Sequence, residues 1–164
     1  LRNLNPDGDA RGHTKDGRAN DHGVDLNRNF PINWQMDWNR DGCWTDTIVT
    51  GGATPGSEPE TKSLMRFIES HNIDALISYH SAALGVFPGG TPWDEDSIRL
   101  AEALADITSY PYPPLDTGCL YTGTLADYAV ERGAVSVDME LSTHVYTDFK
   151  RNLKALKVLL EWER

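Results

Sequence analysis

The stretch that decides the fold is Ile73-Asp74-Ala75-Leu76-Ile77-Ser78-Tyr79-His80. A short apolar run of this length, placed directly after a helix, predicts a buried strand. The predicted helix begins at Ser57, which serves as its N-cap and forms a capping box with Glu60, and it ends near Asn72. A helix that leads straight into a buried strand is typical of α/β folds.

The rest of the chain repeats this alternation of helix and strand. A second strand is predicted from Ala134 to Leu141, and the stretch from Gly85 to Gly90 is interpreted as a glycine-rich loop. Further helices are predicted from near Pro92 or Asp94, from Thr124 to Arg132, and after a Thr147 cap, the last with an apolar stripe of Phe149, Leu153, Leu156 and Leu160. We therefore expect an α/β fold with a mixed, largely parallel sheet flanked by helices, in a single domain spanning residues 1–164.

The composition excludes some classes of partner. The 164 residues include 25 acidic and 15 basic side chains, giving a net charge of −10. This excess disfavours nucleic acid and anionic membranes as partners, although a local arginine cluster can still attract an anionic ligand. No apolar run approaches the length of a membrane span. Cys43 and Cys119 can form one disulfide in an exported protein or remain two free thiols, so cytoplasmic and exported locations both stay open.

The string Gly23-Val24-Asp25-Leu26-Asn27-Arg28-Asn29-Phe30 combines turn-forming residues with one arginine and apolar anchors. Its Asn27-Arg28 pair offers a fork of guanidinium donors beside a neutral amide. A guanidinium matches a carboxylate with two parallel hydrogen bonds, so the pair is equipped to hold one. The alternative is an Asx-rich turn with a solvated arginine.

Two polar side chains fall at the ends of the two clearest predicted strands. These are His80 and Glu140. In an α/β sheet, ligands bind beyond the carboxyl ends of the strands, so both residues are expected on the same rim. An imidazole and a carboxylate placed there can serve as a metal ligand and a general base, or as a hydrogen-bonded structural pair.

The segment Asp37-Trp38-Asn39-Arg40-Asp41-Gly42 is similar to the start of a calcium-binding loop, with Asp37, Asn39 and Asp41 as candidate Ca²⁺ ligands. The twelfth position of such a loop, where a bidentate glutamate belongs, is Ile48. The match therefore fails at its most diagnostic point. We interpret the segment as a solvated Asx-rich turn, with a calcium site as the less favoured alternative.

Five motifs occur in the order typical of zinc metallocarboxypeptidases, and the resemblance covers essentially the whole chain. They are Asn5-Pro6-Asp7-Gly8, Arg18-Ala19-Asn20, Gly23 to Phe30, Ser78-Tyr79-His80-Ser81 and Asp138-Met139-Glu140-Leu141. The bacterial branch is the most similar. The segments Gly23 to Pro31, Asn33-Trp34 and Pro55 to Thr61 resemble the murein peptide amidases of that branch. Ser81-Ala82-Ala83 is more similar to an ordinary carboxypeptidase.

The resemblance implies a role for each matching residue. His80 would be one of three protein ligands of a catalytic Zn²⁺. Glu140 would be the general base that takes a proton from the metal-bound water and passes it to the leaving amine. Arg18 would face the developing oxyanion. Asn27 and Arg28 would hold the terminal carboxylate of the substrate.

The resemblance also implies two residues that contact the end of the substrate. Tyr121, in the loop before the third predicted helix, would close over the terminal carboxylate. Ala126, just before the Asp127-Tyr128 pair, would form the floor of the specificity pocket. An uncharged floor suits apolar residues, and murein peptides that contain diaminopimelate remain an alternative substrate.

One part of the family pattern is absent from this sequence. The other two zinc ligands of the family come from a His-x-x-Glu motif upstream of the Asn-Pro-Asp-Gly turn, and the chain contains no such motif. We expect that an N-terminal segment is missing and that the chain is inactive alone. The intact enzyme would then hydrolyse a peptide or murein-peptide bond next to a free carboxylate. The alternative is a non-catalytic module that binds a carboxylate or peptide without a complete zinc site.

Overall fold

The computed structural model describes residues 3–10, 17–43 and 49–163. Its contacts divide the chain into two compact units. The loop unit, as we name it, combines Leu1–Asn72 with Asp116–Tyr128, and the sheet unit combines Ile73–Leu115 with Ala129–Arg164. That the whole chain forms one catalytic domain stays a prediction.

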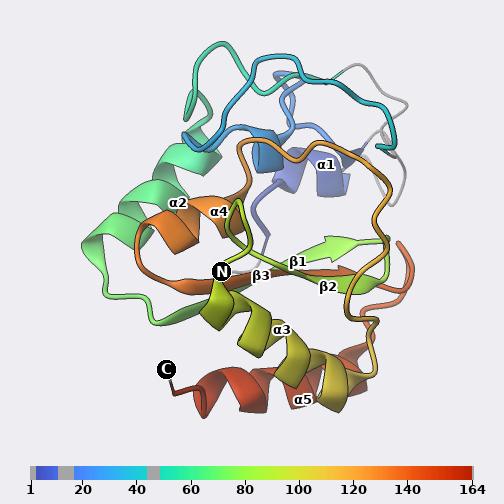
Figure 1. Cartoon of the computed structure of the whole chain (residues 1–164). Coiled ribbons are helices and arrows are strands. Elements are labelled where there is room, and N and C mark those ends of the chain that lie inside the picture. The colour runs from blue at the N-terminus through green and yellow to red at the C-terminus, as the bar shows by residue number, and fades with distance from the viewer. Residues whose placement is uncertain (1–2, 11–16, 44–48, 164) are drawn as a thin grey trace. The chain divides into compact units, whose positions relative to one another are not determined.

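The sheet unit is built on three strands, β1 (Ala75–Ser81), β2 (Gly85–Pro88) and β3 (Val135–Leu141). Their order is β1-β3-β2, with β3 parallel to β1 and antiparallel to β2 (Figure 1). The predicted α/β class with a mixed sheet is therefore confirmed. The central strand β3 is paired on both edges, and Val135, Ser136, Val137 and Met139 in it are buried.

Helices α3 (Glu95–Thr108) and α5 (Phe149–Leu160) lie on the same side of this sheet (Figure 1). The Asp94 carboxylate caps α3 by accepting a hydrogen bond from the Ser97 N–H, as expected for a helix that starts at this aspartate. The core of the unit is an apolar cluster of Val86, Leu100, Ala101, Leu104, Tyr110, Val135, Val137, Met139 and Ala155.

Two sequence predictions in the sheet unit are wrong. The expected loop from Gly85 to Gly90 contains β2, because Val86 and Pro88 are buried beside β3 and a Cβ at Gly85 would lie 3.2 Å from the Pro114 Cβ. The N-cap of α5 is Asp148 rather than Thr147. The Asp148 carboxylate does not cap the helix and instead accepts a hydrogen bond from the Tyr110 hydroxyl at 2.8 Å.

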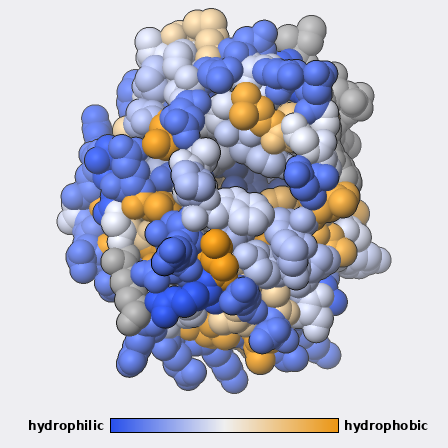
Figure 2. Space-filling model, viewed as in Figure 1, coloured by the Kyte–Doolittle hydropathy of each residue, from blue (hydrophilic) through white to orange (hydrophobic). Residues whose placement is uncertain are grey.

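The apolar stripe on α5 points away from the core. Its members are all exposed, and the helix packs instead through Ala155, which is fully buried, and Val158. The exposed members are Phe149, Leu153, Leu156 and Leu160. On the face shown in Figure 2, hydrophobic residues form small separate patches within a mostly hydrophilic surface. None of the described helices is long and apolar enough to cross a membrane.

The loop unit contains α1 (Pro6–Ala10), η2 (Leu26–Arg28) and α2 (Pro59–Ser70), joined by long turns. Its organising residue is Asn29, which is completely buried. The Asn29 amide group donates to the Gly51 and Thr54 carbonyls and to the Ser57 hydroxyl, and its oxygen accepts from the Glu58 N–H. Side-chain amides thus satisfy backbone groups that regular structure would otherwise pair.

The start of α2 differs from the prediction. Its N-cap is Glu58 and Pro59 occupies the first helical position, so the expected Ser57 cap and capping box with Glu60 are wrong. The Ser57 hydroxyl instead donates to the Glu58 carboxylate at 2.6 Å. Helix α4 (Leu125–Glu131) lies within the predicted third helix and runs from the loop unit into the sheet unit.

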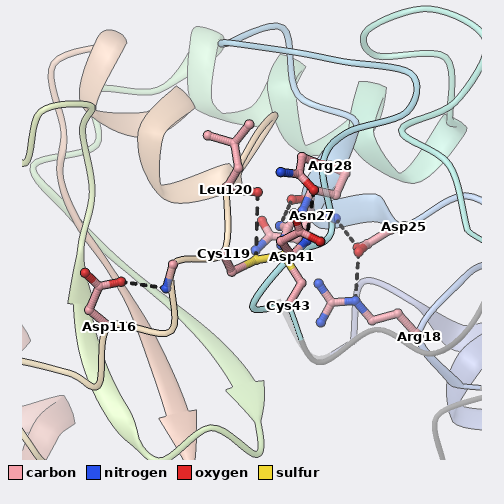
Figure 3. Close-up of a disulfide and its surroundings, with 11 residues drawn as sticks. Arg18, Asp25, Asn27, Arg28, Asp41, Cys43, Asp116, Cys119 and Leu120 are labelled. Atoms are coloured by element: carbon pink, nitrogen blue, oxygen red, sulfur yellow. Dashed lines mark hydrogen bonds and ion pairs between the residues drawn. A yellow bond between two sulfur atoms is a disulfide. The ribbon is translucent and has the colours of Figure 1, made fainter.

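A disulfide links Cys43 and Cys119 within the loop unit (Figure 3). It closes a loop between cysteines that are 76 residues apart, with their Cα atoms 4.6 Å from each other. The sequence left this pairing and two free thiols as alternatives, and the structure selects the pairing.

Candidate functional site

The candidate residues of the loop unit are organised by Asp25, which is 2% exposed. The carboxylate of Asp25 caps η2 by accepting from the Asn27 N–H at 3.1 Å. Its second oxygen accepts from the Arg18 Nε at 2.7 Å (Figure 3). Arg18 is thereby held by a buried carboxylate, and part of its side chain remains exposed to solvent.

Two arginines keep the buried Asp25 ionised. Burial by itself raises the pKa of a carboxyl group, because it disfavours the charged form. For Asp25, attraction to Arg18 and Arg28 and the hydrogen bonds from Arg18 and Asn27 outweigh burial, so its pKa lies below the usual value. A fixed negative charge therefore lies beneath the two cationic side chains.

The Asn27 side chain joins η2 to the start of α4. Its amide oxygen accepts from the Leu125 N–H at 2.8 Å. This bond uses one of the backbone donors that a helix N-terminus leaves without an intrahelical partner. The next residue in α4 is Ala126, which is 3% exposed. Asn27 therefore links the candidate carboxylate-binding turn to the start of α4. Ala126, which is expected at the floor of the specificity pocket, is the next residue there.

Arg28 is buried, with 4% of its surface exposed, and is flanked by aromatic rings. Its guanidinium carbon lies 5.3 Å from the Tyr121 ring centroid and 5.4 Å from that of Trp38. Its Nη1 donates to the Asn27 carbonyl at 2.7 Å. Tyr121 is 45% exposed, so it lies at the surface edge of this arrangement.

The calcium-like turn forms local contacts. The Asp37 carboxylate accepts from Arg40 at 2.7 Å, and the Asn39 side chain accepts from the Asp41 N–H at 3.0 Å. Ile48, the twelfth position, lies outside the described residues. Across residues 3–10, 17–43 and 49–163 no group of three or more His, Cys, Asp and Glu side chains could hold a metal ion.

The candidate residues of the sheet unit, His80 and Glu140, are direct register partners on the parallel strands β1 and β3. Both lie near the carboxyl ends of their strands, which is where ligands bind in open α/β sheets. The His80 Nε2 lies 2.8 Å from the Ser78 hydroxyl and 3.5 Å from an Asp138 oxygen. The Glu140 carboxylate accepts from the Ala83 N–H at 3.2 Å.

The described residues do not complete a zinc site. A catalytic Zn²⁺ needs three protein ligands and an open position. His80 can supply one of them, but the described part of the chain contains no group of three His, Cys, Asp or Glu side chains that could hold a metal ion. The described residues could therefore supply part of a zinc site but not a complete one.

A second cluster, which the sequence analysis did not identify, surrounds the buried Glu58. Its carboxylate accepts from Asn20 at 2.8 Å and from Ser57 at 2.6 Å, and one oxygen lies 2.6 Å from the His22 Nδ1. Glu58 and His22 are 36 residues apart in sequence, so their pairing depends on the tertiary fold. The glutamate thus connects the segment around Asn20 to the start of α2.

The His22–Glu58 pair should make stability depend on pH. The hydrogen bond and charge of Glu58 raise the pKa of His22 above 6.5. Burial raises the pKa of Glu58, but hydrogen bonds from Ser57, Asn20 and His22 outweigh it and lower this pKa below 4.5. The His22 contribution is present below 6.5 and is lost as pH rises through its folded pKa. The Glu58 contribution is present above 4.5 and is lost as pH falls through its own folded pKa.

We expect the denaturation midpoint of the wild type to fall between about pH 6 and about pH 8, and His22→Gln to remove most of this fall. His71→Gln is the matched control, because the His71 Nδ1 lies 3.0 Å from the Ser70 hydroxyl and 2.8 Å from the Phe67 carbonyl, which are both uncharged. Denaturant unfolding of the three proteins at both pH values measures the effect. An unchanged fall in His22→Gln would show that another group is responsible.

The chain belongs to the zinc carboxypeptidase family, whose model matches residues 1–154. It is 35% identical over 127 residues to mast cell carboxypeptidase A of Rattus norvegicus, which covers 68% of this chain and 30% of that protein. It is 41% identical over 83 residues to murein peptide amidase A of Escherichia coli strain K12, covering 47% of this chain and 33% of the relative. The chain thus spans about a third of the length of these curated relatives.

Solved structures agree with this assignment. Murein-tripeptide amidase MpaA from Escherichia coli O157 matches with a TM-score of 0.67 and 28% identity, over 98% of this chain and 66% of that one. Carboxypeptidase A from Helicoverpa armigera matches with a TM-score of 0.73 at 20% identity, over 98% of this chain and 50% of that one, which shows a shared fold. The predicted family and fold are therefore confirmed.

Proposed function

We propose that this chain forms part of a zinc-dependent peptidase that hydrolyses the bond next to a free terminal carboxylate. In this proposal Asn27 and Arg28 hold the carboxylate, His80 is one zinc ligand and Glu140 is the general base. The zinc carboxypeptidase family consists of peptidases, which supports hydrolysis of peptide bonds as the reaction class. The chain as a whole would then be a carboxypeptidase-like catalytic domain that is incomplete by itself.

The observation that carries the proposal is the setting of Arg28. An isolated buried charge is costly, and the ionised Asp25 carboxylate offsets part of that cost for the Arg28 guanidinium. The Arg28 side chain combines ring contacts on Tyr121 and Trp38 with a hydrogen bond to the Asn27 carbonyl. A guanidinium has five N–H donors in a planar fork, so a carboxylate can be bound along its edge while the rings cover its faces.

Arg18 and Asn27 support this carboxylate site in different ways. Arg18 donates through Nε to Asp25, and this bond would orient the guanidinium that faces the carbonyl oxygen as it becomes negatively charged during hydrolysis. Asn27 accepts through its oxygen from Leu125, and this bond would fix the orientation of its amide group, whose NH₂ is a hydrogen-bond donor. Both arrangements present donors, as the recognition of an anionic substrate end requires.

In the sheet unit, Glu140 would accept a proton from the attacking water and deliver it to the leaving amine nitrogen. A bound Zn²⁺ would supply Lewis acidity that lowers the pKa of that water. His80 would hold the metal through one ring nitrogen, and Ser78 and Asp138 would orient its imidazole. The other ligands would have to come from residues that the described part of the chain does not supply.

The substrate side-chain preference follows from Ala126 in this proposal. Because Ala126 is buried and uncharged, a pocket floored by it would accept an apolar terminal residue without selecting a basic one. Similarity to murein peptide amidase A keeps murein peptides as a second substrate class. A non-catalytic carboxylate-binding module is the alternative function, because a zinc site needs three protein ligands and no group of three such side chains occurs within the residues that the structure describes.

The carboxylate assignment can be tested with the 164-residue chain itself. We expect it to bind a short peptide with a free terminal carboxylate more tightly than the same peptide with a terminal amide. Arg28→Ala should weaken binding of the acid by about 10- to 100-fold, because a charge-assisted bidentate pair is lost. Titration calorimetry with both peptides measures the ratio.

Arg99→Ala is the matched control for this experiment. Arg99 lies on α3 in the sheet unit and pairs with Asp96 at 2.8 Å. It should therefore leave the ratio of acid to amide affinity unchanged. Equal affinity of the wild type for the acid and the amide would contradict the carboxylate assignment.

A further inference from the structure

The rings and guanidinium groups around Arg28 form a continuous set in the loop unit. The Arg28 guanidinium contacts both the Tyr121 and Trp38 rings, and the Arg40 guanidinium lies 4.6 Å from the centroid of the same Trp38 ring. We call Tyr121, Arg28, Trp38 and Arg40 the stacked set. Trp38 is its central member, because it contacts both arginines.

Aromatic rings suit a guanidinium that must bind an anion. They contact its weakly hydrated faces and leave the N–H groups of its edge available for hydrogen bonds. They also restrict the rotamers of a long side chain, so less conformational entropy is lost when the ligand binds. At 4% exposure, Arg28 has few waters of its own, and the rings replace part of that lost solvation.

Trp38 acts through its ring rather than through a hydrogen bond. The side chain is 5% exposed, and its indole N–H has no hydrogen-bond partner among the described residues. A buried tryptophan ordinarily satisfies this donor. The contacts that Trp38 does form are those of its aromatic ring with the two guanidinium groups.

The other members of the set anchor it to the surrounding chain. Arg40 donates through Nη2 to the Val49 carbonyl at 2.6 Å and to Asp37 at 2.7 Å, which ties the Arg40 side chain to the backbone of a buried residue. The Cys43–Cys119 disulfide joins the two segments that carry the rings. Cys43 follows Trp38 by five residues and Cys119 precedes Tyr121 by two. Figure 3 shows Arg28 and Asn27 beside this disulfide.

We propose that Trp38 is a positioning residue for carboxylate recognition, whose ring, together with Tyr121 and the disulfide, holds the Arg28 guanidinium in its binding orientation. The inference rests on the proposed function, because it deepens the role of Arg28. It assigns to the calcium-like turn a part in substrate specificity: the turn carries the ring and the arginine that support the carboxylate-binding residue.

The test compares two substitutions at Trp38 in the 164-residue chain. Trp38→Phe keeps an aromatic face, whereas Trp38→Met fills space with a flexible apolar side chain and has no ring. The ratio of affinities for a free-carboxylate peptide and its amide is measured by calorimetry. We expect Trp38→Met to reduce this ratio about tenfold and Trp38→Phe to stay within about threefold of the wild type.

Trp93→Met is the matched control, because Trp93 is 45% exposed and belongs to the sheet unit. It should leave the ratio unchanged. Recovery by phenylalanine separates a positioning role from a space-filling one, because both substitutions remove the indole N–H and reduce volume. The proposal is overturned if Trp38→Met retains the wild-type ratio or if Trp38→Phe is as impaired as Trp38→Met.

A second measurement covers the case in which Trp38→Met does not fold. Rings that cover the guanidinium should shift the Arg28 Nε–H resonance upfield in the wild type and in Trp38→Phe. An unshifted resonance in the wild type overturns the proposal. If the wild type binds the acid and the amide equally, the carboxylate assignment of Arg28 is rejected. The role of Trp38 is then rejected with it. If the wild type and Trp38→Met both prefer the acid over the amide to the same extent, only the role of Trp38 is rejected.

Discussion

Replacing Glu140 by glutamine in the full-length protein is expected to lower kcat for peptide hydrolysis by about 10³-fold while leaving KM nearly unchanged. Glutamine has almost the same shape as glutamate but cannot accept a proton from water at neutral pH. A general base contributes to the transition state and little to substrate binding, so its loss should appear in kcat. The measurement is steady-state hydrolysis by the zinc-loaded protein.

The local structure around residue 140 should survive this change. The Glu140 carboxylate accepts from the Ala83 N–H, and a glutamine amide oxygen can accept the same hydrogen bond. Glu131→Gln, at the exposed end of α4, is the matched control and should hydrolyse at the wild-type rate. Full activity in Glu140→Gln would reject Glu140 as the base, whatever the identity of the metal ligands.

Removing the disulfide with Cys43→Ser and Cys119→Ser is expected to lower the free energy of unfolding by about 4.5 kcal/mol. The bond closes a loop between residues 76 apart, and a constraint of this size removes much of the freedom of the unfolded chain. The loop unit depends on it more than a regular fold would, because long turns make up most of its backbone. Denaturant unfolding of the oxidised wild type and the double variant measures the difference.

Reduction provides the control for this experiment. Dithiothreitol should destabilise the wild type to the level of the double variant and leave the double variant unchanged. The same loss should weaken peptide-carboxylate binding, because Cys119 lies two residues before Tyr121. A double variant as stable as the oxidised wild type would contradict a structural role for the disulfide.

Local sequence patterns predicted the elements of the sheet unit well. The apolar runs that became β1 and β3 were identified because buried parallel strands are continuously hydrophobic. Strand β2 was missed because four residues with a glycine at one end carry no periodic signal, and the strand exists through its pairing with β3. The placement of His80 and Glu140 on one rim followed from strand ends alone, since carboxyl ends of parallel strands share one rim, whereas their direct pairing in register is known only from the structure.

Capping patterns were less reliable because tertiary contacts use the same side chains. Ser57 was expected to cap α2, yet its hydroxyl donates to Glu58, which itself binds Asn20 and approaches His22. A serine before a helix cannot by itself reveal that a glutamate from the same turn competes for it. The capping box rule holds only where no such partner is present.

The candidate carboxylate site was predicted in part. The Asn27-Arg28 pair was found from chemistry, because guanidinium and amide groups suit a carboxylate. Trp38 was assigned to a calcium-like turn, and its contact with Arg28 could not be derived from spacing. The available signal was the pair of cysteines, since a Cys43–Cys119 bond brings the segment after Trp38 to the segment before Tyr121. The sequence left that bond open as one of two alternatives.

The most direct test of the account is hydrolysis of two matched peptides, one with a free terminal carboxylate and one with a terminal amide, by the zinc-loaded full-length protein and its Glu140→Gln variant. We predict that the wild type releases the terminal residue of the acid and leaves the amide intact, and that Glu140→Gln binds the acid but does not cleave it. Cleavage of both peptides at similar rates, or equal cleavage by the variant, would contradict the account.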